Sequence, residues 1–226
     1  MQSYSGIFGV LHFITTWVMR LSVINVIWFI INLPVFLVVA SVMMNFSTSA
    51  DIIYLSPLLI FGPLLFFPST TALFAMARDW MVDKDHSSLV KSYLFYVKSN
   101  YKKSSMAGFI WVLIWMIWAV DLYFFIGVNS LMGTVILMIG MLLFVTTIHF
   151  FSLSVHYHMT IRQLLKNSLM MTGGRPLLTV GTGLLGLFII YISMDIWFLL
   201  IFFTGSLIAC LSFYLFYRSY IKIRNS

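Results

Sequence analysis

Few side chains in this 226-residue sequence could carry out catalysis or bind a metal. The sequence has no Glu, its one cysteine is Cys210 in an apolar run, and its acids are six aspartates. Three histidines, His149, His156 and His158, lie at or near the end of a long uncharged segment, whereas Asp121 and Asp195 lie at the far ends of such segments. Because acids and histidines are separated, no Ser/His/Asp triad can be assembled. We therefore expect a non-enzymatic protein with no catalytic residue, no cofactor and no metal ligand.

The role of His149 has two interpretations. A histidine inside an apolar segment can serve as a metal ligand or a proton relay, but a metal site would need further ligands that the sequence does not supply nearby. Alternatively, a neutral imidazole can form hydrogen bonds between two helices and needs no ligand. Both interpretations remain open from the sequence.

A second set of residues could either line a transport pathway or pack helices together. The segment 53–77 contains three prolines, and each proline inside a helix leaves a backbone carbonyl without its usual partner. Broken helices of this kind line substrate sites in transporters, but they also bend packed helices. Small residues at i, i+4 spacing allow helices to approach closely, within one chain or at an interface with a partner. The candidates are Asn25, Asn32, Pro34, Pro63, Pro68, Thr70, His149, Gly183, Gly186 and Gly205.

The composition indicates which class of protein must position these residues. The sequence is 62% hydrophobic and 8% charged, with a mean hydropathy of +1.03. A soluble globule of this size needs more surface charge, and a disordered chain needs much lower hydrophobicity. The remaining class is an all-α, polytopic membrane protein formed by a single transmembrane domain over residues 1–226.

Long uncharged segments predict how many times the chain crosses the bilayer. A helix needs about 20 mostly apolar residues to span the hydrocarbon core. The uncharged segments predict six transmembrane helices, near residues 21–44, 53–77, 106–126, 132–155, 177–193 and 196–217.

The positions of the basic residues predict the orientation. All 13 Lys and Arg residues fall before the first predicted span, between spans two and three, between spans four and five, or after span six. The three alternate loops carry only Asp51, Asp121 and Asp195. Because short cytoplasmic loops are rich in Lys and Arg, both termini are predicted to be cytoplasmic. The net charge of +7 then faces the anionic inner leaflet of the bilayer, and no nucleic-acid partner is expected.

The segments outside the spans are predicted to be amphipathic. Residues 1–20 show apolar spacing typical of an interfacial helix. The cytoplasmic loops 78–105 and 156–176 each contain a basic amphipathic helix, capped by Ser87 or Ser88 and by Thr160, because a hydroxyl can accept from a free backbone N–H. These helices either lie on lipid or contact a partner protein. The candidate contact residues are Lys91, Lys98, Lys102, Lys103, Arg162 and Lys166.

Four stretches of the sequence resemble the YesL-like family of bacterial integral membrane proteins. They are NVIWFIINLP at 25–34, PSTTALFAMARDW at 68–80, KSYLFYVKSNYKKSSMAG at 91–108 and SVHYHMTIRQLLKNSLMM at 154–171. The family is a domain of unknown function whose members are commonly encoded beside carbohydrate ABC importers. The resemblance implies an accessory role in carbohydrate uptake at the bacterial plasma membrane, and it supplies no catalytic residues.

Two functions follow as hypotheses. The first is an accessory subunit or assembly factor of a carbohydrate ABC importer, with the permease and ATPase subunits as partners. The alternative is an independent transporter or channel for small solutes that uses the proline-broken second span. The alternative predicts a cavity lined by Asn32, Ser69, Thr70 or His149, whereas a solidly packed core would count against it.

Overall fold

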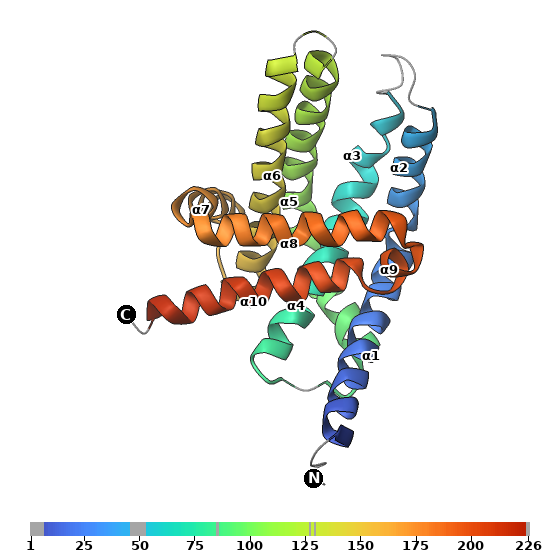
Figure 1. Cartoon of the computed structure of the whole chain (residues 1–226), viewed down its shortest axis with the longest axis vertical. Helices are drawn as coiled ribbons and strands as arrows, with labels where there is room; N and C mark the ends of the chain where they lie inside the picture. Colours follow the sequence, from blue (N-terminus) through green and yellow to red (C-terminus); the bar gives the residue numbers. More distant parts are fainter. Residues whose placement is uncertain (1–6, 46–52, 85, 127, 129, 225–226) are drawn as a thin grey trace.

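The computed structural model describes residues 7–45, 53–84, 86–126, 128 and 130–224 (Figure 1). These ranges contain helices and no strand, which confirms the all-α prediction. The helices are α1 (Ile7–Ile31), α2 (Leu33–Asn45), α3 (Leu58–Phe61), the π-helical turn η2 (Gly62–Phe66), α4 (Phe67–Met81), α5 (Leu89–Ile126), α6 (Ser130–His156), α7 (Ile161–Gly174), α8 (Pro176–Asp195), α9 (Trp197–Phe202) and α10 (Thr204–Arg224).

Five helical segments are long and apolar enough to cross a membrane, where the sequence predicted six spans. They are Gly9–Ile31, Ile53–Met81, Leu89–Ile126, Ser130–His156 and Pro176–Asp195. The sixth predicted span, 196–217, is divided at Phe203 between α9 and α10. Neither of these two helices is among the five segments.

The start of the chain differs from the prediction of a separate interfacial helix over 1–20. Helix α1 runs without a break from Ile7 to Ile31, and residues 1–6 lie outside the described part. The interruption falls at Asn32 instead, between α1 and α2. Pro34 explains this position, because proline has no N–H to donate and its ring clashes with the preceding helical turn. A single charge such as Arg20 breaks no helix.

The predicted basic helix of the loop 78–105 and the predicted span 106–126 form one helix. Helix α5 is continuous over 38 residues, and α4 extends to Met81, so only residues 82–88 connect them. Ser88 caps α5, since its Oγ accepts from the backbone N of Lys91 at 3.4 Å. In the loop 156–176, Thr160 and Gln163 form a capping box at the start of α7. Both capping predictions are confirmed.

Helix α4 is the centre of the fold. Every residue from Phe67 to Ala77 is buried, and α4 contacts α1, α5, α6 and α10. The largest fully buried apolar side chains include Phe74 of α4, Phe150 of α6 and Phe213 of α10. The described core is therefore filled by aromatic and aliphatic side chains around one helix.

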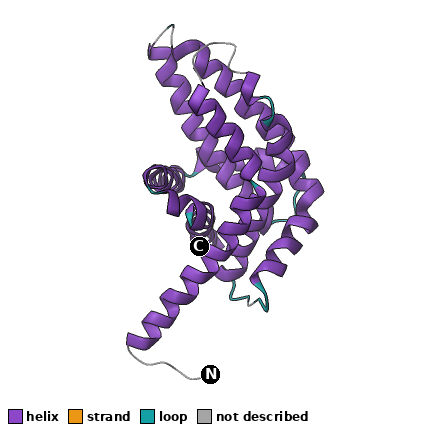
Figure 2. Cartoon of the chain, turned by 90° about the vertical axis from the view of Figure 1, so that its right-hand side faces the viewer, coloured by secondary structure: helices purple, strands orange, loops and turns teal. Residues whose placement is uncertain are grey.

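Two helices cross the others instead of running parallel to them. Helices α8 and α10 contact each other, and in Figure 1 they run side by side across the direction of α5 and α6. Figure 2, turned by 90°, shows helices of this pair nearly end-on beside the long helices. The six predicted spans are thus not one parallel bundle.

Candidate functional site

A buried aspartate, Asp79, lies at the C-terminal end of α4. The helix ends at Met81 with Val82 as its C-cap, and Asp83 then adopts the left-handed conformation, with φ of 55°. The backbone N–H of Lys84 returns to the carbonyl of Asp79 at 2.9 Å. This is the bond that defines a Schellman motif, and Asp is one of the few residues other than Gly that tolerates its left-handed position. The local turn thus brings Lys84 back over Asp79.

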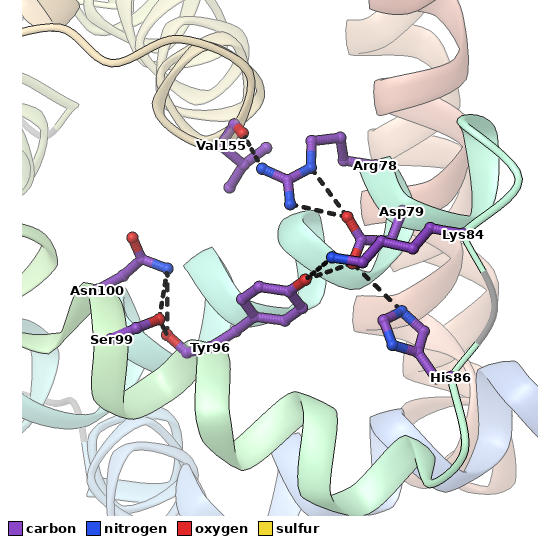
Figure 3. Close-up of polar contacts among 8 residues, drawn as sticks. All are labelled: Arg78, Asp79, Lys84, His86, Tyr96, Ser99, Asn100 and Val155. Carbon is purple, nitrogen blue, oxygen red and sulfur yellow. Dashed lines mark hydrogen bonds and ion pairs between the residues drawn. The ribbon is translucent and has the colours of Figure 1, made fainter.

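The Asp79 carboxylate is surrounded by donors and cations (Figure 3). Nε and Nη2 of Arg78 donate to Oδ1 at 3.1 and 2.7 Å. The hydroxyl of Tyr96, on α5, donates to Oδ2. Nζ of Lys84 lies 3.6 Å from Oδ2, and Nε2 of His86 lies 3.3 Å from it. With its side chain only 1% exposed, this carboxylate needs these partners, because an unpaired buried charge is costly.

Arg78 extends the Asp79 cluster to a third helix. Its Nη1 donates to the backbone carbonyl of Val155 at 2.5 Å, in the last turn of α6. A cation is favourable there, because the free carbonyls of a helix C-terminus carry partial negative charge. The guanidinium also lies 5.8 Å from the centroid of the Tyr96 ring. The cluster of Arg78, Asp79, Lys84, His86 and Tyr96 therefore joins α4, α5 and α6.

Lys84 is a second cation beside the Asp79 carboxylate. The pKa of Lys84 is raised by its hydrogen bond to the Tyr96 hydroxyl, at 3.3 Å, and by the nearby Asp79 carboxylate. Lys84 therefore stays protonated at neutral pH. The arrangement neutralises a buried carboxylate and connects helices. Among the described residues, no group of three or more His, Cys, Asp or Glu side chains could hold a metal ion.

Asp79, His86 and Tyr96 were not predicted from the sequence as site residues. Arg78 and Lys84 were predicted only as part of the basic loop. One feature of the sequence could have indicated an ion pair, because Asp79 directly follows Arg78 in the ARDW string. Nothing in the sequence shows that Tyr96, 17 positions later, reaches back to this carboxylate.

Two comparisons with known proteins give a match. Residues 21–122 match the family described as protein of unknown function, DUF624. The chain is 24% identical over 207 residues to the uncharacterized protein YesL of Bacillus subtilis (strain 168), an alignment that covers 89% of this chain and 84% of that protein. Both matches support the resemblance of this chain to YesL-like proteins. No solved structure matches it.

The family match covers all five side chains of the Asp79 cluster. Arg78, Asp79, Lys84, His86 and Tyr96 lie within residues 21–122, whereas Val155 of α6, whose carbonyl accepts from Arg78, lies outside them. The match also includes a second buried cluster, around Ser69. Asn32 donates to Oγ of Ser69 at 2.8 Å.

The Ser69 cluster contains two of the predicted pathway or packing residues, Asn32 and Thr70. Nε1 of Trp28 donates to Oγ1 of Thr70 at 3.0 Å. The hydroxyl of Tyr93 donates to the backbone carbonyl of Ser69 at 2.9 Å. Asn32 and Thr70 are 0% and 8% exposed. These contacts join α1, α4 and α5, while Oδ1 of Asn32 has no hydrogen-bond partner.

The predicted prolines lie where the second span changes its helical form. Pro63 is the second residue of η2, and Pro68 is the second residue of α4. Both prolines are buried, whereas Pro34 in α2 is half-buried. At Gly108 of α5, an added Cβ would lie 2.9 Å from Cα of Pro63. The altered backbone around Pro63 thus packs closely against α5.

Asn25 and Gly205 meet at the break between α9 and α10. Nδ2 of Asn25 donates to the carbonyls of Leu200 and Ile201 at 3.1 and 2.8 Å, and Oδ1 accepts from the backbone N of Ser206 at 2.8 Å. A Cβ on Gly205 would lie 3.0 Å from the Trp28 ring and 3.1 Å from Oδ1 of Asn25. Asn25 therefore satisfies backbone groups that the helix break leaves free.

His149 belongs to a third polar cluster, between α6 and α7. Its Nδ1 lies 3.1 Å from Oγ1 of Thr172, and Oγ1 of Thr146 donates to the same oxygen at 3.1 Å. Thr179 of α8 donates to the carbonyl of Thr172 at 2.7 Å. Nε2 of His149 has no partner.

The small residues of α8 face α6 across close contacts. A Cβ on Gly183 would lie 3.1 Å from Val145, and one on Gly186 would lie 2.8 Å from Phe144. Both glycines are buried. Gly183 and Gly186 therefore contribute to packing within the chain, whereas the structure does not test their use at an interface with a partner.

The predicted contact residues lie on two helices. Lys91, Lys98 and Lys102 are exposed on α5 and Lys103 is partly buried there, while Arg162 and Lys166 are exposed on α7. None of the six forms part of the Asp79 cluster.

Proposed function

We propose that this YesL-like protein is a non-enzymatic accessory subunit or assembly factor of a carbohydrate ABC importer in the bacterial plasma membrane. One observation carries the proposal. Polar residues of the apolar segments, among them Asn32, Thr70 and His149, form hydrogen bonds between the chain's own helices, while lysines and arginines remain exposed on α5 and α7. These features suit a rigid protein that presents a basic surface to a partner. The link to carbohydrates comes from the family resemblance.

The contacts of the core favour this role over independent transport. A solute pathway needs polar groups that line an accessible cavity. Asn32, Ser69 and His149 are at most 1% exposed, and Thr70 is 8% exposed. None of these four residues lines either of the two best-defined pockets of the described residues. We therefore do not propose that the second span carries a solute.

The proposal includes a topology of six membrane passes with both termini in the cytoplasm. In Figure 1 the C-terminal ends of α5 and α8 point to the top and right, whereas the N-terminal end of α8 and the C-terminal end of α10 lie on the left. If the bilayer normal lies between the direction of α5 and that of α8 and α10, the helix ends that carry Asp121 and Asp195 lie on one side of the membrane. The ends that carry Arg175 and Lys222 then lie on the other side. This separation is what the positive-inside rule requires, and it makes α9 and α10 together the sixth pass.

The exposed apolar surface also supports a membrane-embedded role. Side chains on the outer parts of α5, α6 and α8 are widely exposed, among them Ile117, Met138 and Phe188 at 62 to 64%. Such a surface needs lipid or another transmembrane helix to cover it. An importer permease would cover part of it, with the basic faces of α5 and α7 beside the ATPase.

Affinity purification from a mild detergent tests the accessory role. The tagged chain, expressed in its native host during growth on carbohydrates, should recover a permease and an ATPase. A variant in which Lys91, Lys98 and Lys102 are changed to Gln should lose most of this recovery, while Arg218→Gln with Lys222→Gln should keep it. Recovery of the chain alone, under conditions that keep the importer intact, would contradict the proposal.

A further inference from the structure

A pocket of about 360 Å³ lies among the end of α6, α7 and the C-terminal half of α10. It is separate from the Asp79, Ser69 and His149 clusters, and none of their residues lines it. Its polar wall includes Tyr157, Asn167, Arg175 and Tyr220, and its apolar wall includes Leu153 and Phe216. The pocket thus has one wall with a cation and one apolar wall, a combination that suits an amphiphilic ligand.

The polar wall has hydrogen-bond donors that could bind a ligand. Nη1 of Arg175 donates to Oγ of Ser219 at 2.9 Å, but a guanidinium has five N–H donors. The rings of Tyr157 and Tyr220 meet edge to face at 6.1 Å. Burial and the neighbouring Tyr220 raise the pKa of Tyr157, against the opposing effect of Arg175. The Tyr157 hydroxyl is therefore a neutral donor at neutral pH, beside a fixed cation.

The charges around the pocket favour an anion. The sequence has no Asp or Glu between Leu122 and Met194, or after Asp195. The helices that form the pocket carry four exposed cations, Arg162 and Lys166 on α7 and Arg218 and Lys222 on α10. A cavity surrounded by charge of one sign concentrates ligands of the opposite sign. A neutral or cationic ligand would gain nothing from this arrangement.

The apolar wall continues onto surface that lipid would cover. Met170 lines the pocket and is 61% exposed, and Leu177, in the first turn of α8, is 89% exposed. Buried Leu153 and Phe216 form the inner part. An acyl chain can follow this route from the pocket to the membrane surface, which a free inorganic anion cannot use.

We propose that this pocket binds the phosphate-bearing headgroup of an anionic phospholipid from the inner leaflet, with the phosphate at Arg175 and the two tyrosine hydroxyls. Basic pockets between membrane helices on the cytoplasmic side are suited to such headgroups. The inference rests on the proposed topology, which places α7 on the cytoplasmic side. It does not depend on an importer partner.

Gly174 offers a way to block the pocket without damaging the fold. It lines the pocket, and a Cβ added to it would meet no atom within 4 Å. Its neighbour Gly173 has equally open space but does not line the pocket. Gly174→Phe therefore fills the site, and Gly173→Phe is the matched control. Arg175→Gln removes the cation, and Ser219→Ala removes only its hydrogen-bond partner.

Native mass spectrometry of the full chain, released from a neutral detergent, measures the binding directly. Phosphatidylglycerol should bind the unaltered chain, Gly173→Phe and Ser219→Ala equally well, and phosphatidylcholine should bind much more weakly. Gly174→Phe should abolish the bound phosphatidylglycerol, and Arg175→Gln should weaken it by about fivefold, as expected for one basic residue near an anionic headgroup.

Three outcomes would overturn the lipid site. Gly174→Phe could retain as much phosphatidylglycerol as Gly173→Phe, or phosphatidylcholine could bind as well as phosphatidylglycerol. Inorganic phosphate alone could also compete phosphatidylglycerol away at equal concentration, which would make the ligand a soluble phosphate. Since no importer is present, these outcomes leave the co-purification result unaffected, and the two proposals fail separately.

Discussion

The Tyr96 hydroxyl on α5 donates its hydrogen to Oδ2 of Asp79 on α4, within a cluster that also reaches α6 through Arg78. This bond connects the two helices that flank the short connection 82–88. It satisfies the one aspartate whose side chain is almost fully buried among the described residues. The cluster therefore holds the C-terminal ends of α4 and α6 and the N-terminal part of α5 in a fixed arrangement.

Removing the Tyr96 hydroxyl should cost more stability than removing the hydroxyl of Tyr93 on the same helix. Tyr96→Phe loses a bond to a carboxylate, which contributes about 1.5–3 kcal/mol. Tyr93→Phe loses a bond to the backbone carbonyl of Ser69, which contributes about 1 kcal/mol. Thermal or urea unfolding in detergent micelles measures both. Equal losses would mean that Asp79 does not depend on Tyr96.

Arg78 and Asp79 should show strong energetic coupling. Asp79→Asn leaves Arg78 without its counter-ion, and breaking a buried ion pair costs about 3–5 kcal/mol. Because Arg78 is 28% exposed, we expect the lower end of that range. The double variant with Arg78→Met should lose at least about 1 kcal/mol less than the sum of the single losses. Lys84→Gln is the control and should lose much less stability than Asp79→Asn, because the Lys84 side chain is exposed. Additive single losses would contradict the coupling.

Asn25 should stabilise the break between α9 and α10. Asn25→Leu keeps the branched shape of the side chain but leaves two carbonyls and one N–H without their partner, at a total cost of about 2–4 kcal/mol. Asn100→Leu is the control, because Asn100 bonds only within its own helix, to Tyr96 and Ser99. That control should change stability by about 0.5 kcal/mol or less. A similar loss in both variants would show that the break holds without Asn25.

Two glycine substitutions should have opposite effects. Gly205→Ala places a Cβ 3.0 Å from the Trp28 ring, and such overpacking costs about 1–3 kcal/mol. Gly181→Ala meets only Leu215, at 3.8 Å, and should gain about 0.5–1 kcal/mol from helix propensity. Unfolding of the two variants side by side checks the sign. A stabilising Gly205→Ala would show that α1 and α10 are not in close contact there.

Local features of the fold could be predicted from the sequence because their causes are local. The hydroxyls of Ser88 and Thr160 act within three residues of themselves, and Gly174 and Pro176 mark the junction of α7 and α8. The helical class follows from composition. The predicted boundary at Arg20, between an interfacial helix and the first span, was wrong. A charged residue indicates where a helix leaves the hydrocarbon core, but it does not end the helix.

Features that depend on distant residues could not be predicted. The break at Phe203 has no proline beside it, and its free backbone groups are satisfied by Asn25, about 180 positions earlier. The Asp79 cluster depends on Tyr96 and Val155 in the same way. Asn32 and Thr70 were recognised as unusual, but only their partners Ser69 and Trp28 show that they bond between helices.

Cysteine labelling tests most directly whether the basic faces of α5 and α7 lie on the cytoplasmic side. The single native cysteine, Cys210, is buried, so a Cys210→Ser background should be clean. Single cysteines at the exposed positions Lys98, Lys166, Asp121 and Asp195 are then treated with a membrane-impermeant maleimide. We predict labelling of Asp121→Cys and Asp195→Cys in intact cells, and of Lys98→Cys and Lys166→Cys only after permeabilisation. Labelling of Asp195→Cys on the same side as Lys166→Cys would contradict the account.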